Sequence, residues 1–185
     1  MNESILDFIN GFAGRSSLLD SAGRFGANDL IYVLGAFLLV LGVRELLRDR
    51  RSAIRIGVTA VFAVGASLVI GVIIAHFWYE ARPFVTYPET VKLVSHAADA
   101  SFPSDHSLVA GAAATVALLA WPRWGIVAAV LAILIAVSRV FVGIHYPGDV
   151  AGGLLIGAIC ALAAWWAMAR AVRFIPLLAS PAPAS

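Results

Sequence analysis

Charge is scarce in this sequence. Only 13% of its 185 residues are Asp, Glu, Lys or Arg, whereas 61% are hydrophobic and the mean hydropathy is +0.91. Soluble domains carry about 25% charged residues and a smaller apolar fraction. The shortage of charge therefore excludes an ordinary soluble domain and indicates a protein of the lipid bilayer.

Cysteine and histidine are also sparse, with one cysteine and four histidines. Cys160 lies alone in an apolar stretch and cannot form an intramolecular disulfide, and so few Cys and His residues do not suggest a zinc site. The net charge of +2 is small, and most arginines stand in short clusters between apolar segments. We therefore expect no metal, no cofactor and no nucleic-acid partner.

Five apolar segments predict an all-α fold, a polytopic membrane helix bundle in which residues 1–185 form one domain. Before them, Ile5, Phe8, Ile9 and Phe12 recur at helical spacing, which predicts an amphipathic interfacial helix within residues 1–25. The Ala-Pro segment at residues 176–185 is expected to be disordered. The expected transmembrane helices are residues 30–47, 56–79, 104–121, 125–143 and 148–170.

The arginines predict the orientation of the bundle, because short loops rich in Lys and Arg remain in the cytoplasm. By this rule the first and third connections and the segment after the last helix are cytoplasmic. The second and fourth connections, and the N-terminal helix, then face outside the cell. The arginines that set this orientation are Arg44, Arg48, Arg50, Arg51, Arg55, Arg123, Arg170 and Arg173.

Two outward connections contain ionisable residues that orientation does not explain. The second includes Ala81-Arg82-Pro83 and ends in Pro103-Ser104-Asp105-His106, where the third transmembrane helix is expected to begin. The fourth reads Ser138-Arg139, five residues, His145, three residues and Asp149. These two connections are therefore the place to look for chemistry.

The residue types in these segments suit the binding and transfer of phosphate. Ser104 can act as the N-cap of a helix whose free N–H groups form an anion site. His145 and Asp149 lie four residues apart, so the carboxylate can hold one ring nitrogen and leave the other free to attack. Arg82 and Arg139 offer forked donors that match phosphate oxygens.

Each of these residues also has a structural interpretation. The histidines could be solvated residues at helix ends, the arginines could extend to lipid headgroups, and Ser104 could be a cap alone. His96 and Asp99 could shape a pyrophosphate pocket or only solvate their loop, and both interpretations stay open. The pattern Gly153-x-x-x-Gly157 is expected to pack the fifth helix inside its own bundle, with dimerisation as the alternative.

The three motifs resemble those of the phosphatidate phosphatase type 2 superfamily, over about residues 75–149. Within it, the run His-Ala-Ala-Asp-Ala-Ser-Phe-Pro-Ser-Asp-His from His96 to His106 is similar to the bacitracin-resistance type of undecaprenyl-pyrophosphate phosphatase. The resemblance implies a metal-independent enzyme of the bacterial plasma (inner) membrane. Its substrate would be undecaprenyl pyrophosphate, hydrolysed outside the cytoplasm to the lipid monophosphate that carries cell-wall precursors.

The resemblance also implies roles for individual residues. His145 would attack the terminal phosphorus to form a phosphohistidine, with Asp149 orienting it. His106 would protonate the departing lipid phosphate and then activate water. The phosphoryl oxygens would be bound at Arg82, Ser104, Asp105 and Arg139.

Two positions depart from the superfamily pattern. Ala75 stands where the first motif usually begins with lysine, and Asp105 places a carboxylate where many members have glycine. An alternative function within the superfamily is hydrolysis of phosphatidate or phosphatidylglycerol phosphate. From another class, a non-catalytic transporter or structural membrane protein would leave the paired histidines unexplained.

Overall fold

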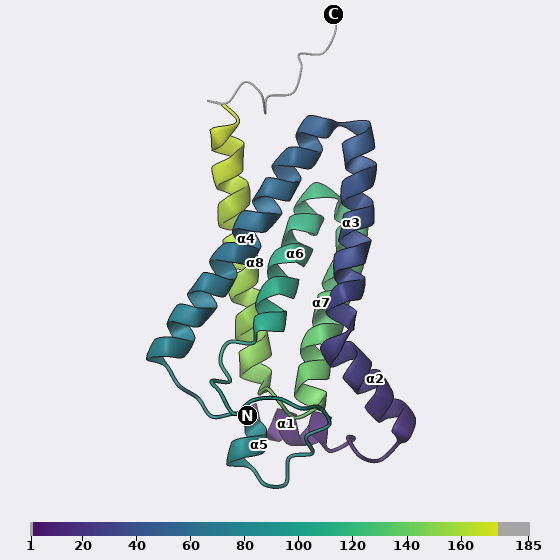
Figure 1. Cartoon of the computed structure of the whole chain (residues 1–185), viewed down its shortest axis with the longest axis vertical. Coiled ribbons are helices and arrows are strands. Elements are labelled where there is room, and N and C mark those ends of the chain that lie inside the picture. Colours follow the sequence, from purple (N-terminus) through teal and green to yellow (C-terminus); the bar gives the residue numbers. More distant parts are fainter. Residues whose placement is uncertain (1, 174–185) are drawn as a thin grey trace, which may run out of the picture.

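The computed structural model describes residues 2–173, and within them the chain forms eight helices (Figure 1). The expected disordered segment at residues 176–185 lies outside the described residues. Five long helices form an elongated bundle, and three shorter ones gather at one end of it. The long helices are α3 (Leu30–Arg48), α4 (Arg50–Phe77), α6 (Asp105–Ala120), α7 (Pro122–Phe141) and α8 (Pro147–Ala171), and the short ones are α1 (Asn2–Asn10), α2 (Ser17–Asn28) and α5 (Pro83–Thr86).

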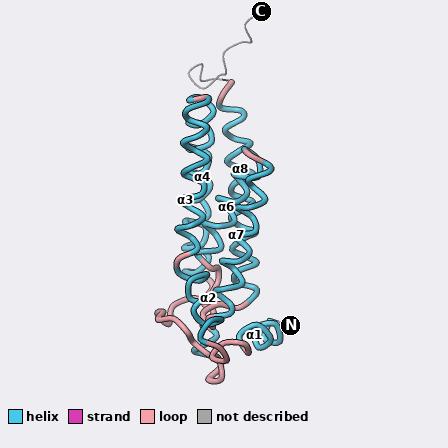
Figure 2. The backbone as a smooth tube through the Cα atoms, turned by 90° about the vertical axis from the view of Figure 1, so that its right-hand side faces the viewer, coloured by secondary structure: helices cyan, strands magenta, loops and turns pink. Residues whose placement is uncertain are grey.

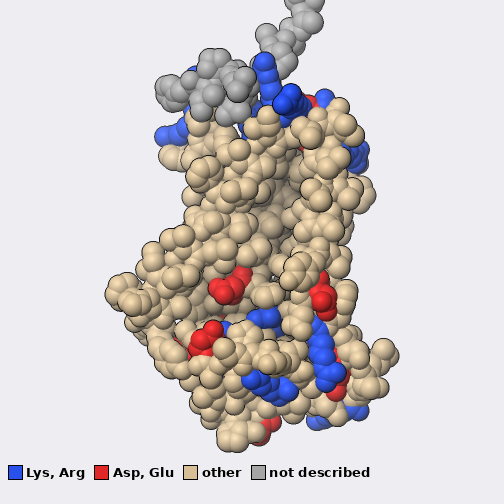
Figure 3. All heavy atoms as spheres, viewed as in Figure 1, with Lys and Arg blue, Asp and Glu red and all other residues tan. Residues whose placement is uncertain are grey.

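Four of the five long helices have the length and composition of membrane spans. Helices α3, α4, α7 and α8 contain 19 to 28 residues, and their most apolar windows have mean hydropathies of 1.9 to 2.6. Figure 3 shows that, on the face it presents, charged residues lie near the two ends and leave an apolar band between them. The expected all-helical membrane bundle is therefore confirmed.

Helix α6 is the shortest of the five and lies in the middle of the bundle (Figures 1 and 2). Its 16 residues span about 24 Å at 1.5 Å per residue, less than the hydrocarbon thickness of about 30 Å. It packs against α4, α7 and α8, which surround it. The residue at its N-cap, Ser104, is fully buried, so α6 begins inside the bundle.

Glycines allow α6 and α8 to approach closely. A Cβ atom placed on Gly157 would lie 2.3 Å from the carbonyl oxygen of Leu108, and one on Gly111 would lie 2.5 Å from that of Leu154. A Cβ atom on Gly153 would lie 2.8 Å from the carbonyl oxygen of Ser104. The small-residue pattern on α8 thus packs the helix against α6 within the chain.

The N-terminal segment differs from the single interfacial helix expected within residues 1–25. The structure has two helices there, because the chain turns between them at Gly14, whose φ of +76° favours glycine. Helix α1 lies across the end of the bundle in Figure 2. It buries Leu6 and leaves Ile5 and Phe8 exposed, so it keeps the amphipathic character that the spacing indicates.

The second of these helices, α2, continues almost directly into α3 and packs against α7. A Cβ atom on Gly26 would meet the Ser138 hydroxyl at 2.1 Å, and one on Gly23 would meet the Phe141 ring at 2.3 Å. The sequence spacing could not show this contact, because it joins residues more than 100 positions apart. Helix α2 is therefore part of the bundle as well as of the N-terminal segment.

We predict that Gly157→Ala destabilises the protein, whereas Gly65→Ala does not. The added methyl at Gly157 would collide with the α6 backbone, and overpacking of this kind costs about 1–3 kcal/mol. Nothing lies within 4 Å of a Cβ atom on Gly65, which is exposed on α4. Thermal unfolding in one detergent, followed by circular dichroism, should give a lower Tm for Gly157→Ala alone. Equal Tm values would contradict the close contact.

Candidate active site

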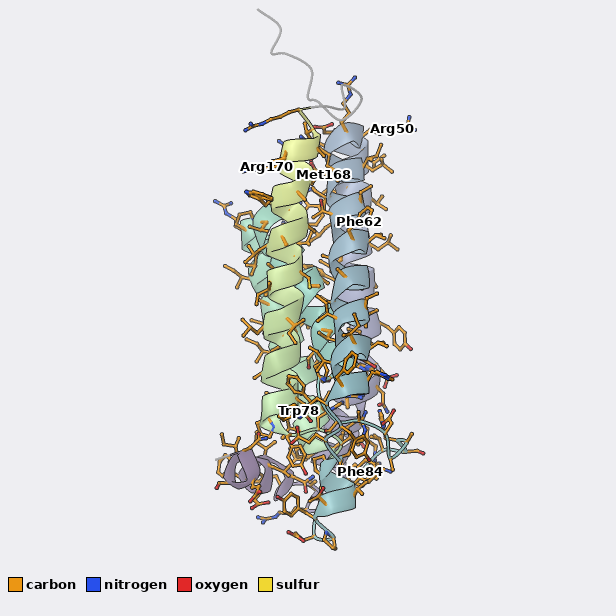
Figure 4. The ribbon with its side chains drawn as sticks, turned by 90° about the vertical axis from the view of Figure 1, so that its left-hand side faces the viewer. Arg50, Phe62, Trp78, Phe84, Met168 and Arg170 are labelled. Carbon is orange, nitrogen blue, oxygen red and sulfur yellow. The ribbon has the colours of Figure 1, made fainter. Side chains whose placement is uncertain are left out.

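Two connections meet at the end of the bundle that also carries α1 and α5. In Figure 4, Trp78 and Phe84 lie at this end, and Arg50 and Arg170 lie at the other. The long connection between α4 and α6 folds back on itself, because the Ser101 N–H donates to the Glu80 carbonyl oxygen at 2.8 Å. Further along the connection, the Leu93 N–H donates to the Val142 carbonyl oxygen at 3.1 Å, which ties it to the α7–α8 turn.

The α7–α8 turn sets the position of His145. Gly143, with a φ of +78°, allows the chain to reverse after α7, and Pro147 begins α8. His145 therefore lies two residues before α8, while Asp149 lies in its first turn. Both side chains are buried, at 1% exposure, and His145 Nδ1 lies 3.3 Å from Asp149 Oδ2.

Asp149 is held by more partners than its spacing to His145 indicates. Its Oδ2 also accepts hydrogen bonds from the Ser101 hydroxyl and, at 2.8 Å, from the Tyr146 backbone N–H. Ser101 is fully buried and comes from the long connection. Sequence reasoning missed its role, since no spacing signal links residues 48 positions apart. The carboxylate thus assigns the proton of His145 to Nδ1 and leaves Nε2 unprotonated, with a lone pair that can accept or attack.

Arg82 lies beside the free nitrogen of His145. Its Nη1 is 3.1 Å from His145 Nε2 and donates to the Ile144 carbonyl oxygen at 2.9 Å. Its Nη2 donates to the Ala100 carbonyl oxygen at 3.1 Å, and its Nε donates to Asp99 Oδ1 at 2.7 Å. These contacts hold the guanidinium in one orientation, with one edge directed at His145.

Arg139 approaches the same nitrogen from α7. Its Nη2 lies 3.5 Å from His145 Nε2 and 3.4 Å from His96 Nε2, while its Nη1 donates to the Ala27 carbonyl oxygen at 3.1 Å. Its buried Nε has no hydrogen-bond partner among residues 2–173. Arg82 and Arg139 are the two arginines that the described part of the chain buries. Their N–H groups converge in front of the free nitrogen of His145.

The start of α6 completes this cluster. Ser104 occupies the N-cap position, but its buried hydroxyl caps no N–H and bonds to no other described residue. The expected side-chain cap is therefore not formed. His106, in the first turn, is half-buried and interacts electrostatically with Arg139, His145 and His96. The first-turn N–H groups of any helix lack intrahelical acceptors, so this end of α6 suits an anion.

Asp105 is placed differently from the other predicted site residues. Its side chain is exposed, and its Oδ1 lies 3.9 Å from the position of a Cβ atom on Gly71 of α4. Within residues 2–173 its carboxylate forms no hydrogen bond or ion pair, although it attracts Arg139 electrostatically. The side chain thus faces α4, and only its backbone N–H remains available at the start of α6. Ala75 lies in the last turn of α4.

Burial controls the protonation of His145. Desolvation, with Arg139 and Arg82 acting in the same direction, lowers the pKa of His145 to about 4, although Asp149 opposes the shift. The ring is therefore neutral near pH 7 and suited to nucleophilic attack. At Asp99, burial acts to raise the pKa, but the hydrogen bond and charge of Arg82 outweigh it and leave the pKa below its ordinary value.

The described residues contain no group of three or more His, Cys, Asp or Glu side chains arranged to hold a metal ion. The predicted residues that the structure brings together are Arg82, Ser104, His106, Arg139, His145 and Asp149.

Comparison with known proteins assigns the family. Residues 56–173 match the PAP2 superfamily, which is more than half of the chain. The chain belongs to the PAP2 superfamily. It is therefore a membrane lipid phosphatase, as the resemblance of its motifs implies, and the non-catalytic alternative is not retained.

The relatives include one undecaprenyl-diphosphatase and one putative undecaprenyl-diphosphatase. The chain is 38% identical over 175 residues to the putative undecaprenyl-diphosphatase YbjG of Escherichia coli, covering 91% of this chain and 84% of the relative. It is 35% identical over 159 residues to the undecaprenyl-diphosphatase BcrC of Bacillus subtilis, covering 86% and 80%. The crystal structure of LpxE from Aquifex aeolicus shares the fold, with a TM-score of 0.69 at 24% identity over 88% of this chain and 93% of that one.

We predict that a radiolabelled lipid phosphate labels the protein at His145 and that labelling continues as the pH falls from about 7 to about 5. A nucleophile with a pKa of about 4 stays neutral over this interval, whereas an ordinary histidine, near 6.5, would become mostly protonated. The test is the rate of single-turnover labelling measured by rapid quench.

His145→Ala should give no acid-labile label, and His106→Ala should still form it, more slowly. Label that persists in His145→Ala would show that another residue is the nucleophile. A wild-type rate that halves near pH 6.5 on acidification would contradict the lowered pKa of His145.

Proposed function

We propose that this protein hydrolyses undecaprenyl pyrophosphate to undecaprenyl phosphate and inorganic phosphate through a phosphohistidine intermediate. The observation that carries the proposal is the free nitrogen of His145, which faces two buried arginines while Asp149 holds the opposite nitrogen. The similarity of the chain to one undecaprenyl-diphosphatase and one putative undecaprenyl-diphosphatase over most of its length supports this substrate rather than a glycerolipid.

In the first step, His145 Nε2 attacks the terminal phosphorus. A nitrogen–phosphorus bond forms, and the bond from phosphorus to the bridging oxygen breaks, with its electron pair passing to that oxygen. His106 donates a proton to the departing lipid phosphate. Arg82 and Arg139 stabilise the charge on the phosphoryl oxygens, and the Ser104 hydroxyl adds a further donor.

In the second step, water replaces His145 on phosphorus. His106, now neutral, takes a proton from the water as its oxygen bonds to phosphorus, and the nitrogen–phosphorus bond breaks. Asp149 keeps the Nδ1 proton in place and stabilises the positive charge that the phosphorylated ring carries. Inorganic phosphate leaves, and His145 is again neutral and free.

The two arginines supply the positive charge that a metal ion provides in many phosphoryl-transfer enzymes. Both come from fixed positions, since their guanidinium groups donate to backbone carbonyl oxygens. Preorganised charge of this kind needs little rearrangement when the transition state forms. We therefore propose a metal-independent reaction.

An apolar cleft beside the site supports a lipid substrate. It has a volume of about 410 Å³ and opens between the end of α4 and the start of α8. Asp149 forms part of its wall, so the cleft reaches the carboxylate that holds His145. Burial and then Asp149 raise the pKa of Glu80, which also lines it. The lining residues are Asn2, Ile74, Trp78, Glu80, Phe102, Gly148 and Asp149.

We predict that the purified protein releases phosphate from undecaprenyl pyrophosphate faster than from phosphatidate or phosphatidylglycerol phosphate, and that excess EDTA leaves the rate unchanged. The comparison requires one detergent, equal surface concentrations of lipid and a colorimetric assay of inorganic phosphate. His145→Ala serves as the control for contaminating phosphatases and should fall to background.

Faster turnover of a glycerolipid phosphate would favour the alternative function within the superfamily. Loss of activity in EDTA that magnesium restores would rule out the metal-independent mechanism and leave the substrate assignment standing.

We also propose that the site faces outside the cytoplasm. In Figure 3, Lys and Arg gather both around the site and at the opposite end of the bundle, and the arginines at that opposite end lie in the short connections that the positive-inside rule assigns to the cytoplasm. The α3–α4 turn is the richest in arginine, and it lies at the far end of α4 from Trp78 in Figure 4. Hydrolysis would then take place on the outer leaflet.

Two serines offer a matched test of this orientation. Ser95 lies in the long connection, and Ser52 lies in the first turn of α4. Each is replaced by cysteine in a protein whose buried Cys160 has been changed to alanine. We predict that a membrane-impermeant thiol reagent labels Ser95→Cys in intact spheroplasts and labels Ser52→Cys only after lysis. The reverse pattern would place the site on the cytoplasmic side.

A further inference from the structure

His96 lies at the edge of the site and has no part in the proposed mechanism. Its side chain is 25% exposed, and its ring Nδ1 lies 3.2 Å from the Ala97 carbonyl oxygen. That contact assigns the ring proton to Nδ1 and leaves Nε2 as an acceptor. Nε2 lies 3.4 Å from Arg139 Nη2. The ring therefore presents a nitrogen to the site rather than to solvent.

His96 lies near each of the groups that take part in the proposed reaction. Its ring centroid lies 6.3 Å from that of His145, and it interacts electrostatically with His106. Its Nδ1 is 3.8 Å from Asp99 Oδ1, which is the carboxylate that binds Arg82. His96 thus lies close to both arginines of the site and to the two other histidines, His106 and His145.

The backbone that carries His96 is held in place. Lys92 Nζ donates to the His96 carbonyl oxygen at 2.8 Å, and the same ammonium group lies 3.7 Å from the centre of the Phe84 ring. Leu93, which follows Lys92, donates its backbone N–H to the Val142 carbonyl oxygen at 3.1 Å. A side chain on such an anchored segment can contribute to binding without a large loss of conformational entropy.

We propose that His96 binds the second phosphate of a diphosphate headgroup and so favours prenyl diphosphates over prenyl monophosphates. This inference rests on the proposed function. When His145 attacks in line, the bridging oxygen departs on the far side of the phosphorus, toward His106. The second phosphate is attached to that oxygen, and His96, whose Nε2 lies 3.4 Å from Arg139 Nη2 and whose ring centroid lies 6.3 Å from that of His145, is close enough to contact it.

The charge of the site fits this role. Burial lowers the pKa of His96, with Arg82 and Arg139 acting in the same direction, so the free ring is neutral. A second phosphate would offset the two arginines and favour protonation of the ring. His96 Nε2 would then change from an acceptor to a charged donor, and a monophosphate substrate would bring no group to meet it.

The test is a comparison of two competitive inhibitors with the same prenyl chain, a methylene bisphosphonate and a simple phosphonate. We expect His96→Ala to weaken inhibition by the bisphosphonate by roughly 10- to 100-fold, the value of one hydrogen bond to a charged group. Inhibition by the phosphonate should change by less than about threefold. His76→Ala is the matched control, because His76 is an exposed histidine at the same end of the bundle, and it should leave both constants unchanged.

Equal weakening of both inhibitors would overturn the proposal, since it would place His96 against the transferred phosphate or in the fold. No change in either would also overturn it and would leave His96 as a solvated loop residue. The substrate comparison of the wild-type protein is a separate measurement, so a failure of the proposed function can be told apart from a failure of this subsite.

Discussion

Oδ2 of the Asp149 carboxylate accepts hydrogen bonds from three residues in two connections of the chain. The Ser101 hydroxyl comes from the long connection, the Tyr146 N–H from the α7–α8 turn and Nδ1 from His145. Because the carboxylate is buried, each of these bonds offsets the cost of removing its charge from water. The same bonds fix the His145 ring and join the two connections. One carboxylate therefore both orients His145, the proposed nucleophile, and ties the two connections together.

The site also buries two positive charges. Arg82 and Arg139 are both nearly inaccessible, with exposures of 5% and 4%, and each donates to backbone carbonyl oxygens. Asp99 neutralises part of the charge of Arg82 from the solvent side. Arg139 has no such carboxylate within bonding distance among the described residues, and its Nε has no partner. Of the two, Arg139 therefore gains most from a phosphate, since a bound anion would satisfy a donor that the described chain leaves unpaired.

The sequence predicted the parts of this protein that depend on local spacing. Five apolar segments predicted the bundle, and the interval between His145 and Asp149 predicted their pairing at the start of a helix. The parts that it missed depend on contacts between distant segments. Nothing in the spacing of Ser101 indicates that it reaches Asp149, and the turn at Gly14 that divides the N-terminal segment is visible only once α1 and α2 have partners on α7. The sequence also did not indicate where the Asp105 side chain points, because its orientation depends on the packing of α4 beside it.

The short length of α6 connects the fold to its chemistry. A helix that spanned the whole bilayer would place its first turn, and therefore its free N–H groups, among the lipid headgroups and in contact with water. Helix α6, at about 24 Å, begins among α4, α7 and α8, and Ser104 at its N-cap is fully buried. The lower dielectric there strengthens the attraction between the arginines and a phosphate. A phosphate on a lipid can reach this buried site while its chain remains in the bilayer, whereas a free polar phosphate ester would have to leave water. The burial of the site thus favours a membrane-anchored substrate before any side chain recognises the lipid.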